Sequence, residues 1–246
     1  KIGKWMGYID VAGFLMQYDD MMEFTFGMWG QKGPGFKSVN VGETQISGIE
    51  LSLTGQGKIT RDVSINILAG YTYMSPISLD LESVYATDIS GTGATYQNSS
   101  SDSRVLKYRY KHIAKFDAEI IYKKLSLGSS FRYNDFMQNI DKIFTSVLIN
   151  GNYEDNPLRD DPALNGADDG NTPTYDSWEG LIPGINAARE KFKNGDLIID
   201  LRAGYQMTKT ARLGFIVNNL LNTEYMSRPA NMMPPRTFAM QLALKI

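Results

Sequence analysis

The chain has 246 residues, with 25 basic and 27 acidic side chains and a formal net charge of −2. This length allows a sizeable folded core, while the near-neutral charge excludes a field that would gather nucleic acid or an anionic membrane surface. With no cysteine and one histidine, His112, the chain also excludes disulfides, thiol catalysis and metal clusters built on several of its own histidines.

The start of the chain, "KIGKWMGYID", lacks the charged, apolar and small-residue pattern of a signal peptide. We therefore expect that a leader was removed or that the chain is a fragment. The longest apolar runs, such as the one within "SINILAGY", fall far short of the roughly 20 residues that a membrane helix needs. A helical membrane protein is excluded.

Apolar and polar side chains alternate in many segments along the chain. This pattern predicts about nine β-strands, each with one apolar face. In chain order the expected strands are residues 4–18, 22–28, 48–58, 62–74, 115–124, 126–133, 197–206, 212–219 and 237–246. The last strand shows the pattern most clearly, with Phe238, Met240, Leu242, Leu244 and Ile246 all facing one way.

The predicted connections alternate between very short and very long. The short ones are "DD" after Tyr18, "TRD" after Ile59, "KK" before Leu125 and "TKT" after Met207. The long ones run over about residues 78–104 and 141–194, and we expect residues 219–235 to form the last outer hairpin loop. Tight turns at one rim and extended loops at the other are typical of an outer-membrane barrel.

A β-sandwich is the alternative, because its strands also alternate and its apolar face packs on a second sheet. Three features favour lipid as the partner of the apolar face. The strands are longer than those of most soluble sheets. Their other face carries charges, and aromatic residues such as Trp5, Tyr71 and Tyr133 collect towards the strand ends. His112 begins a strand, and we expect it near the rim rather than in a catalytic site.

Two motifs resemble the C-terminal half of TonB-dependent outer-membrane receptors, especially those of Bacteroidota. The first is the Asn-Val-Gly, spacer, Gly-Ile-Glu pattern, and the second is Asn-Leu-Leu-Asn-x-x-Tyr followed by Pro-Pro-Arg-Thr-Phe. The residues that carry the resemblance are Asn40, Gly42, Gly48, Glu50, Asn219, Asn222, Tyr225, Pro235, Arg236 and Phe238. Both motifs occur in the family's order, and the strand rhythm between them fits, so the resemblance spans nearly the whole chain.

This resemblance implies an all-β fold: an antiparallel transmembrane barrel of 22 strands with long extracellular loops, filled by a plug domain. Residues 1–246 are then the C-terminal portion of the barrel, roughly its last two-fifths, with the plug and the N-terminal strands absent. The chain ends on Ile246, where such barrels usually end on an aromatic residue. The implied partners are outer-membrane lipid, the remainder of the barrel and plug, the TonB complex and a surface lipoprotein. No nucleic acid and no cofactor are expected.

The implied function is active uptake of a scarce nutrient, a siderophore, vitamin, oligosaccharide or peptide, across the outer membrane of a Gram-negative bacterium. The alternative is a non-transporting β-protein, such as a glycan-binding module or a structural barrel subunit of a surface assembly. An enzyme is not expected, because no nucleophile and base or metal ligands stand in a catalytic pattern.

Candidate ligand sites fall in the predicted long loops. Aromatic side chains there can stack on a sugar or a siderophore; they are Tyr85, Tyr96, Tyr153, Tyr175 and Trp178. Four acidic residues of one loop are weak calcium candidates, namely Asp160, Asp161, Asp168 and Asp169, and a solvated polar loop is the favoured interpretation. Near-helical spacing over residues 178–188 predicts a short helix near the barrel mouth.

Charged residues on the non-apolar face of the strands have two interpretations, salt bridges to the plug or simple hydration. They are Glu50, Asp117, Glu119, Arg132, Asp200 and Arg202.

Overall fold

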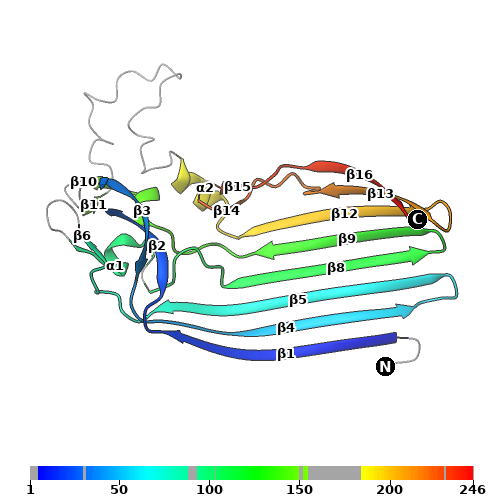
Figure 1. Ribbon diagram of the computed structural model, residues 1–246, viewed down its shortest axis with the longest axis horizontal. Coiled ribbons are helices and arrows are strands. Elements are labelled where there is room, and N and C mark those ends of the chain that lie inside the picture. Colours follow the sequence, from blue (N-terminus) through cyan, green and yellow to red (C-terminus); the bar gives the residue numbers. More distant parts are fainter. Residues whose placement is uncertain are drawn as a thin grey trace, which may run out of the picture.

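The computed structural model describes residues 5–29, 32–87, 93–102, 104–149, 152–154, 184–229 and 231–245. Its main element is an antiparallel sheet of eight strands in the order β1-β4-β5-β8-β9-β12-β13-β16 (Figure 1). The strands are β1 Trp5–Tyr18, β4 Thr44–Lys58, β5 Val63–Ser78, β8 His112–Tyr122, β9 Leu125–Asn134, β12 Asp196–Gln206, β13 Ala211–Asn218 and β16 Thr237–Leu244. Each strand pairs with the sheet strand that follows it along the chain, which confirms the expected all-β antiparallel fold.

Short turns close one end of the sheet, over residues 59–62, 123–124 and 207–210. Two of them begin with a threonine whose hydroxyl accepts a backbone N–H three residues on, Thr60 from Val63 at 3.1 Å and Thr208 from Ala211 at 3.0 Å. This side-chain bond reverses the chain locally. In the two-residue turn, Lys123 takes a left-handed conformation, with φ of 52°. Three of the four predicted short turns are thus confirmed.

Long excursions leave the opposite end, which we call the long-loop end (Figure 1). Their described residues form four two-stranded hairpins and two short helices. The hairpins are β2 Met22–Met28 with β3 Pro34–Asn40, β6 Ala86–Thr87 with β7 Gly93–Ala94, β10 Val147–Ile149 with β11 Asn152–Glu154, and β14 Met226–Arg228 with β15 Asn231–Met232. The helices are α1 Tyr96–Ser99 and α2 Ile185–Lys191, with a 3₁₀ turn at Lys142–Phe144. Neither helix in this described part is long and apolar enough to cross a membrane.

The strand expected at residues 22–28 forms, but it lies outside the main sheet. It pairs with β3, placing Met22 opposite Asn40. The "DD" segment after Tyr18 therefore leads into an outer hairpin and is not a rim turn, which is why the described sheet has eight strands rather than about nine. The helix expected near the mouth is present as α2, while residues 178–183 of that expectation lie outside the described part.

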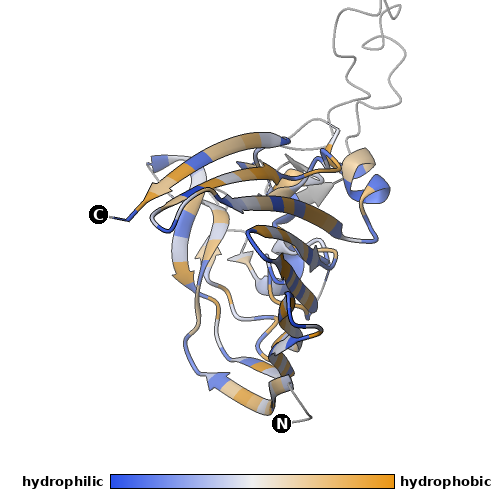
Figure 2. Cartoon of the chain, turned by 90° about the vertical axis from the view of Figure 1, so that its right-hand side faces the viewer, coloured by the Kyte–Doolittle hydropathy of each residue, from blue (hydrophilic) through white to orange (hydrophobic). Residues whose placement is uncertain are grey.

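The strand register aligns one apolar face across the whole sheet. Val11 is opposite Leu51, which is opposite Tyr71, and at the other edge Phe215 is opposite Met240. Viewed along the strands, the sheet bends into an open arc with the two ends of the chain near its free edges (Figure 2).

The apolar face of the sheet is bare. Val11 is 67% exposed, Leu127 63% and Met240 79%. A β-sandwich needs a second sheet over this face, and the described residues supply none. The sheet lacks the partner that a water-soluble sandwich would require, as expected of a face that meets lipid.

The buried core lies in the loops instead of under the sheet. One cluster joins Phe26 of β2 to residues of the β9–β12 loop: Met137, Ile140, Ile143 and Phe144. A second cluster joins the start of β4 to the β5–β8 loop: Val41, Ile46, Tyr96 and Leu106. The outer loops therefore pack on one another across segments far apart in the sequence.

Candidate functional site: the polar face and the outer loops

The polar face of the sheet carries ion pairs that run across strands. Arg202 of β12 reaches past β9 to Asp117 of β8, with both guanidinium nitrogens 2.6 Å from carboxylate oxygens. Arg132 lies 3.0 Å from Asp200, and Arg212 lies 3.7 Å from Glu119. The expected charged residues thus share one face, and five of the six pair with neighbours in the same wall. Neither interpretation from the sequence, plug contact or plain hydration, anticipated this pairing.

Two glycines make room for these arginines. A Cβ atom on Gly128 would stand 2.6 Å from the guanidinium carbon of Arg202. A Cβ atom on Gly204 would stand 2.5 Å from Ser126 Oγ and 2.7 Å from a guanidinium nitrogen of Arg212. Both separations are shorter than van der Waals contact, so only glycine lets the arginines lie flat along the wall.

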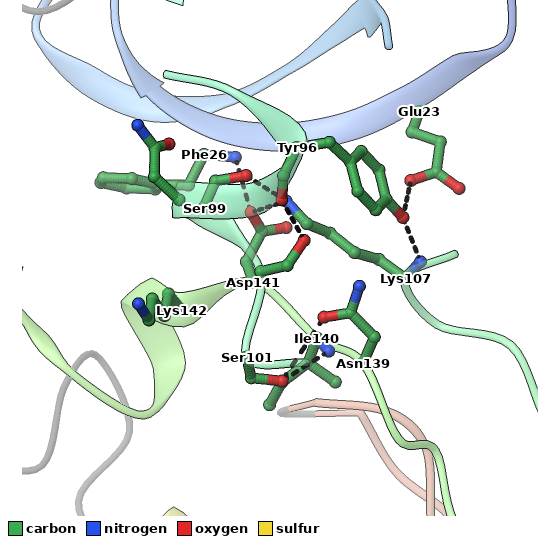
Figure 3. Close-up of polar contacts among 12 residues, drawn as sticks. Glu23, Phe26, Tyr96, Ser99, Ser101, Lys107, Asn139, Ile140, Asp141 and Lys142 are labelled. Carbon is green, nitrogen blue, oxygen red and sulfur yellow. Dashed lines mark hydrogen bonds and ion pairs between the residues drawn. The ribbon is translucent and has the colours of Figure 1, made fainter. Parts of the chain in front are cut away.

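A buried ion pair ties the outer loops together (Figure 3). Lys107 of the β5–β8 loop contacts Asp141 of the β9–β12 loop, with Nζ and Oδ1 separated by 2.7 Å and both side chains fully buried. The Tyr108 hydroxyl donates to Asp141 Oδ2 at 2.5 Å, and the backbone N–H of Phe26 donates to Oδ1 at 3.4 Å. Burial lowers the pKa of Lys107, which Asp141 partly opposes. Three loops therefore meet at one carboxylate.

Glu23 of β2 extends this network. The Tyr96 hydroxyl donates to its Oε2 at 3.2 Å (Figure 3). Arg109 lies 3.6 Å from its Oε1. The backbone N–H of Lys107 donates to the same tyrosine oxygen at 2.5 Å. Burial raises the pKa of Glu23, while Arg109 and Lys107 partly oppose that rise.

The aromatic ligand candidates fare differently. Tyr96 is fully buried with its hydroxyl bonded inside the network, so it packs the loop core and has no face free to stack on a ligand. Tyr85 is half-buried against the same core, and its hydroxyl donates to the carbonyl of Thr95 at 3.1 Å. The side chain of Tyr153 is not described, and Tyr175 and Trp178 lie outside the described residues.

The four calcium candidates in residues 160–169 also lie outside the described part of the chain. Within the part that is described, acidic and histidine side chains form no group of three able to hold a metal ion. His112 begins β8, as expected. Its Nδ1 lies 2.8 Å from the Tyr71 hydroxyl, and its ring packs beside Tyr71 and Tyr73.

The Asn-Leu-Leu-Asn motif builds the turn that ends β13. Asn219 and Asn222 both take left-handed conformations, with φ of 51° and 53°. The Asn219 side chain accepts the N–H of Thr223 at 2.9 Å and donates to its carbonyl at 3.0 Å, while Asn222 accepts the N–H of Arg236 at 2.9 Å. Asparagine suits such positions because it tolerates positive φ and bonds locally. The motif is thus a structural device of the loop.

The first motif is also structural at its glycines. Gly42 has φ of 83°, and a Cβ atom there would stand 2.6 Å from Asp80. At Gly48 a Cβ atom would stand 2.2 Å from the carbonyl of Tyr73. Asn40 ends β3, while Glu50 of β4 lies between Ala12 and Thr72 in the sheet. In the second motif, Phe238 stacks on Phe215 across strands, Tyr225 lines a cavity described below, and Pro235 precedes Arg236 in the approach to β16.

A bare apolar face, a charged opposite face and loops packed at one end define a segment of an outer-membrane β-barrel wall. A family model described as TonB dependent receptor-like, beta-barrel, matches residues 3–220. The chain belongs to this family of outer-membrane receptors, which are not enzymes. Membership of the family places the chain in the outer membrane of Gram-negative bacteria. No curated protein matches the sequence.

Solved structures show the same fold at low identity. The siderophore receptor PiuA from Acinetobacter baumannii is 18% identical with a TM-score of 0.53, over 97% of this chain and 26% of that one. The copper transporter OprC is 14% identical with a TM-score of 0.53, over 100% of this chain and 30% of that one. The outer membrane transporter YddB from Escherichia coli is 12% identical with a TM-score of 0.53, over 100% and 31%.

The chain thus spans less than a third of the length of these receptors. The matches do not support the expected affiliation with Bacteroidota, since the organisms named are Acinetobacter baumannii and Escherichia coli.

Proposed function

We propose that this chain is the C-terminal portion of a receptor that takes up a scarce nutrient across the outer membrane, energised through TonB. The observation that carries the proposal is the division of the sheet into two faces. The apolar face is bare, as suits lipid, and the polar face holds its ion pairs, as suits a wet lumen. The chain would supply barrel wall and outer loops.

The two edges of the sheet support the need for further barrel strands. Within the described sheet, β1 pairs only with β4, and β16 pairs only with β13. In hydrocarbon, backbone groups left without hydrogen bonds cost several kcal/mol each. The edges would therefore pair with strands of the remaining barrel, and a plug would face the polar side. A surface lipoprotein would meet the outer loops.

The related structures support a solute as cargo, since they include a siderophore receptor and a copper transporter. The rival function is a glycan-binding module or a structural subunit without transport. It would not explain why charged side chains cover the face of the sheet that points into the barrel. The candidate cargoes are a siderophore, a vitamin, an oligosaccharide or a peptide.

An uptake assay tests the proposal. The whole receptor is expressed in a Gram-negative host that lacks its own receptors, and growth is measured on iron chelates, cobalamin, peptides and oligosaccharides as limiting nutrients. At least one nutrient should support growth only when both the receptor and TonB are present. Growth that never depends on the pair would refute transport.

A further inference from the structure

A cavity of about 190 Å³ lies where three outer loops meet, beyond the ends of β9 and β12. In Figure 1, α2, β14 and β15 gather at this point. Each loop supplies apolar side chains to the lining: Tyr110 from the β5–β8 loop, Met137, Ala188 and Phe192 from the β9–β12 loop, and Met226 and Met232 from the β13–β16 loop.

The walls of the cavity hold one another in place. Arg189 of α2 donates to the carbonyls of Met137 and Gln138 at 3.0 Å each, and its guanidinium lies 4.5 Å from the ring centroid of Phe136. The Tyr110 hydroxyl donates to the carbonyl of Met226 at 3.4 Å. Arg189 and Tyr110 thus already bond to the walls, and these bonds hold the loops around the space. The charged residues Asp135, Asp196, Glu224 and Arg228 also line the cavity.

The lining selects the chemistry of an occupant. A buried water needs two to four polar partners, and an apolar cavity of about 150 Å³ is known to stay dry and bind benzene. Most of the lining surface is apolar, so a sugar would bury most of its hydroxyls against carbon, which is costly. Methionine sulfurs instead favour the edges of aromatic rings, and three methionines line this space.

We propose that this cavity binds one aromatic ring of the transported ligand. The inference rests on the proposed transport function and narrows its cargo: a nutrient that carries an aromatic group fits the cavity, and an unsubstituted oligosaccharide does not. Met232, 55% exposed, lies on the β14–β15 side of the cavity and offers an edge contact to the entering ring.

The test uses 4-bromophenol, a single ring with a bromine that X-ray anomalous scattering can locate. Crystals of the whole receptor are soaked with it, and its binding to the solubilised receptor is measured by calorimetry. Ala188→Phe fills the cavity, so the binding that remains in this variant is binding to detergent. Ala187→Phe places the same side chain on an exposed position of the same helix and controls for the added phenylalanine. Met232→Ala trims the wall without adding bulk.

We expect a bromine peak between Ala188, Met137 and Met226. Ala188→Phe should abolish the peak and weaken binding at least about tenfold, Ala187→Phe should change neither, and Met232→Ala should weaken binding about threefold to tenfold. No peak in the unsubstituted receptor, a cavity filled by the receptor's own side chains, or full binding by Ala188→Phe would overturn the proposal.

Uptake separates this inference from the proposed function. If Ala188→Phe imports the receptor's nutrient as well as Ala187→Phe does, the ring site is wrong and transport stands. If the unsubstituted receptor imports nothing in a TonB-dependent way, transport fails whatever the bromine shows.

Discussion

Removing the ammonium group of Lys107 should loosen the outer loops while the sheet stays intact. In Lys107→Met, the carboxylate of Asp141 keeps the hydroxyl of Tyr108 and the N–H of Phe26 as donors but loses its only charged partner among the described residues. Both members of the pair are fully buried, and breaking such a pair on one side typically costs about 3–5 kcal/mol.

Hydrogen exchange measures this cost where it falls. The amide of Tyr108 bonds to the carbonyl of Asn139 at 2.8 Å, across the two loops that the pair joins. A loss of about 3 kcal/mol should speed its exchange roughly 150-fold, because about 1.4 kcal/mol is a factor of ten. Amides in the β4–β5 ladder, such as that of Leu51, should keep their rates.

Two further variants sharpen the result. Lys193→Met removes the lysine of an exposed ion pair with Glu190. This loss should lower stability by at most about 1 kcal/mol, so the exchange rate of the Tyr108 amide should change less than about fivefold. Adding Asp141→Leu to Lys107→Met should recover much of the loss, because no buried charge is then left alone. If the Tyr108 amide exchanges equally slowly in Lys107→Met and the original receptor, the buried pair does not hold the loops.

Three more outcomes follow from the geometry. Because burial raises the pKa of Glu23 above 4.5, its contribution to loop stability is full below pH 4.5 and declines as pH rises through the higher folded-state value. Loop exchange, corrected for its intrinsic pH dependence, should show this decline, and Glu23→Gln should flatten it; an unchanged slope would contradict the assignment. Met240→Arg, on the apolar face, should destabilise the receptor in bilayers by about 2–4 kcal/mol in urea titrations, whereas Gln241→Arg, next to it on the polar face, should cost far less. Equal losses would mean that the faces are misassigned. Gly128→Ala should displace the guanidinium of Arg202 from Asp117 and lower stability by at most about 1 kcal/mol, while Gly70→Ala, whose new Cβ would come no closer than 4.0 Å to other atoms, serves as the control in the same titration.

The sheet was predictable because lipid and water impose a two-residue period on every strand. The run Val63 to Tyr73 shows that period with one interruption, Leu68, and it forms the first part of β5. The same period misled at residues 22–28, because a hairpin with one buried face alternates just as a barrel strand does. Alternation reports a two-sided environment and does not tell which sheet a strand joins.

The loop network could not be predicted in this way. Lys107 and Asp141 lie in different loops, 34 residues apart, and nothing in the sequence near either residue marks the other as its partner. Their burial arises only when three loops pack, so no local pattern announces it. Tyr96 was misjudged for the same reason, since a tyrosine in a polar loop looks available until its neighbours close over it. Gly128 and Gly204 fit the alternation, but their role depends on arginines one strand away.

The pairing of charges within the polar face affects how strongly the barrel wall would hold a plug that moves inside it. Arg202 already pairs with Asp117, and Arg132 already pairs with Asp200. These four side chains are therefore not free to form ion pairs with a plug inside the barrel. A plug that moved along the barrel axis would break few ion pairs with this wall, because the ion pairs join neighbouring strands of the wall to one another. The ion pairs would then resist separation of the strands around the barrel while adding little resistance to movement along the barrel axis.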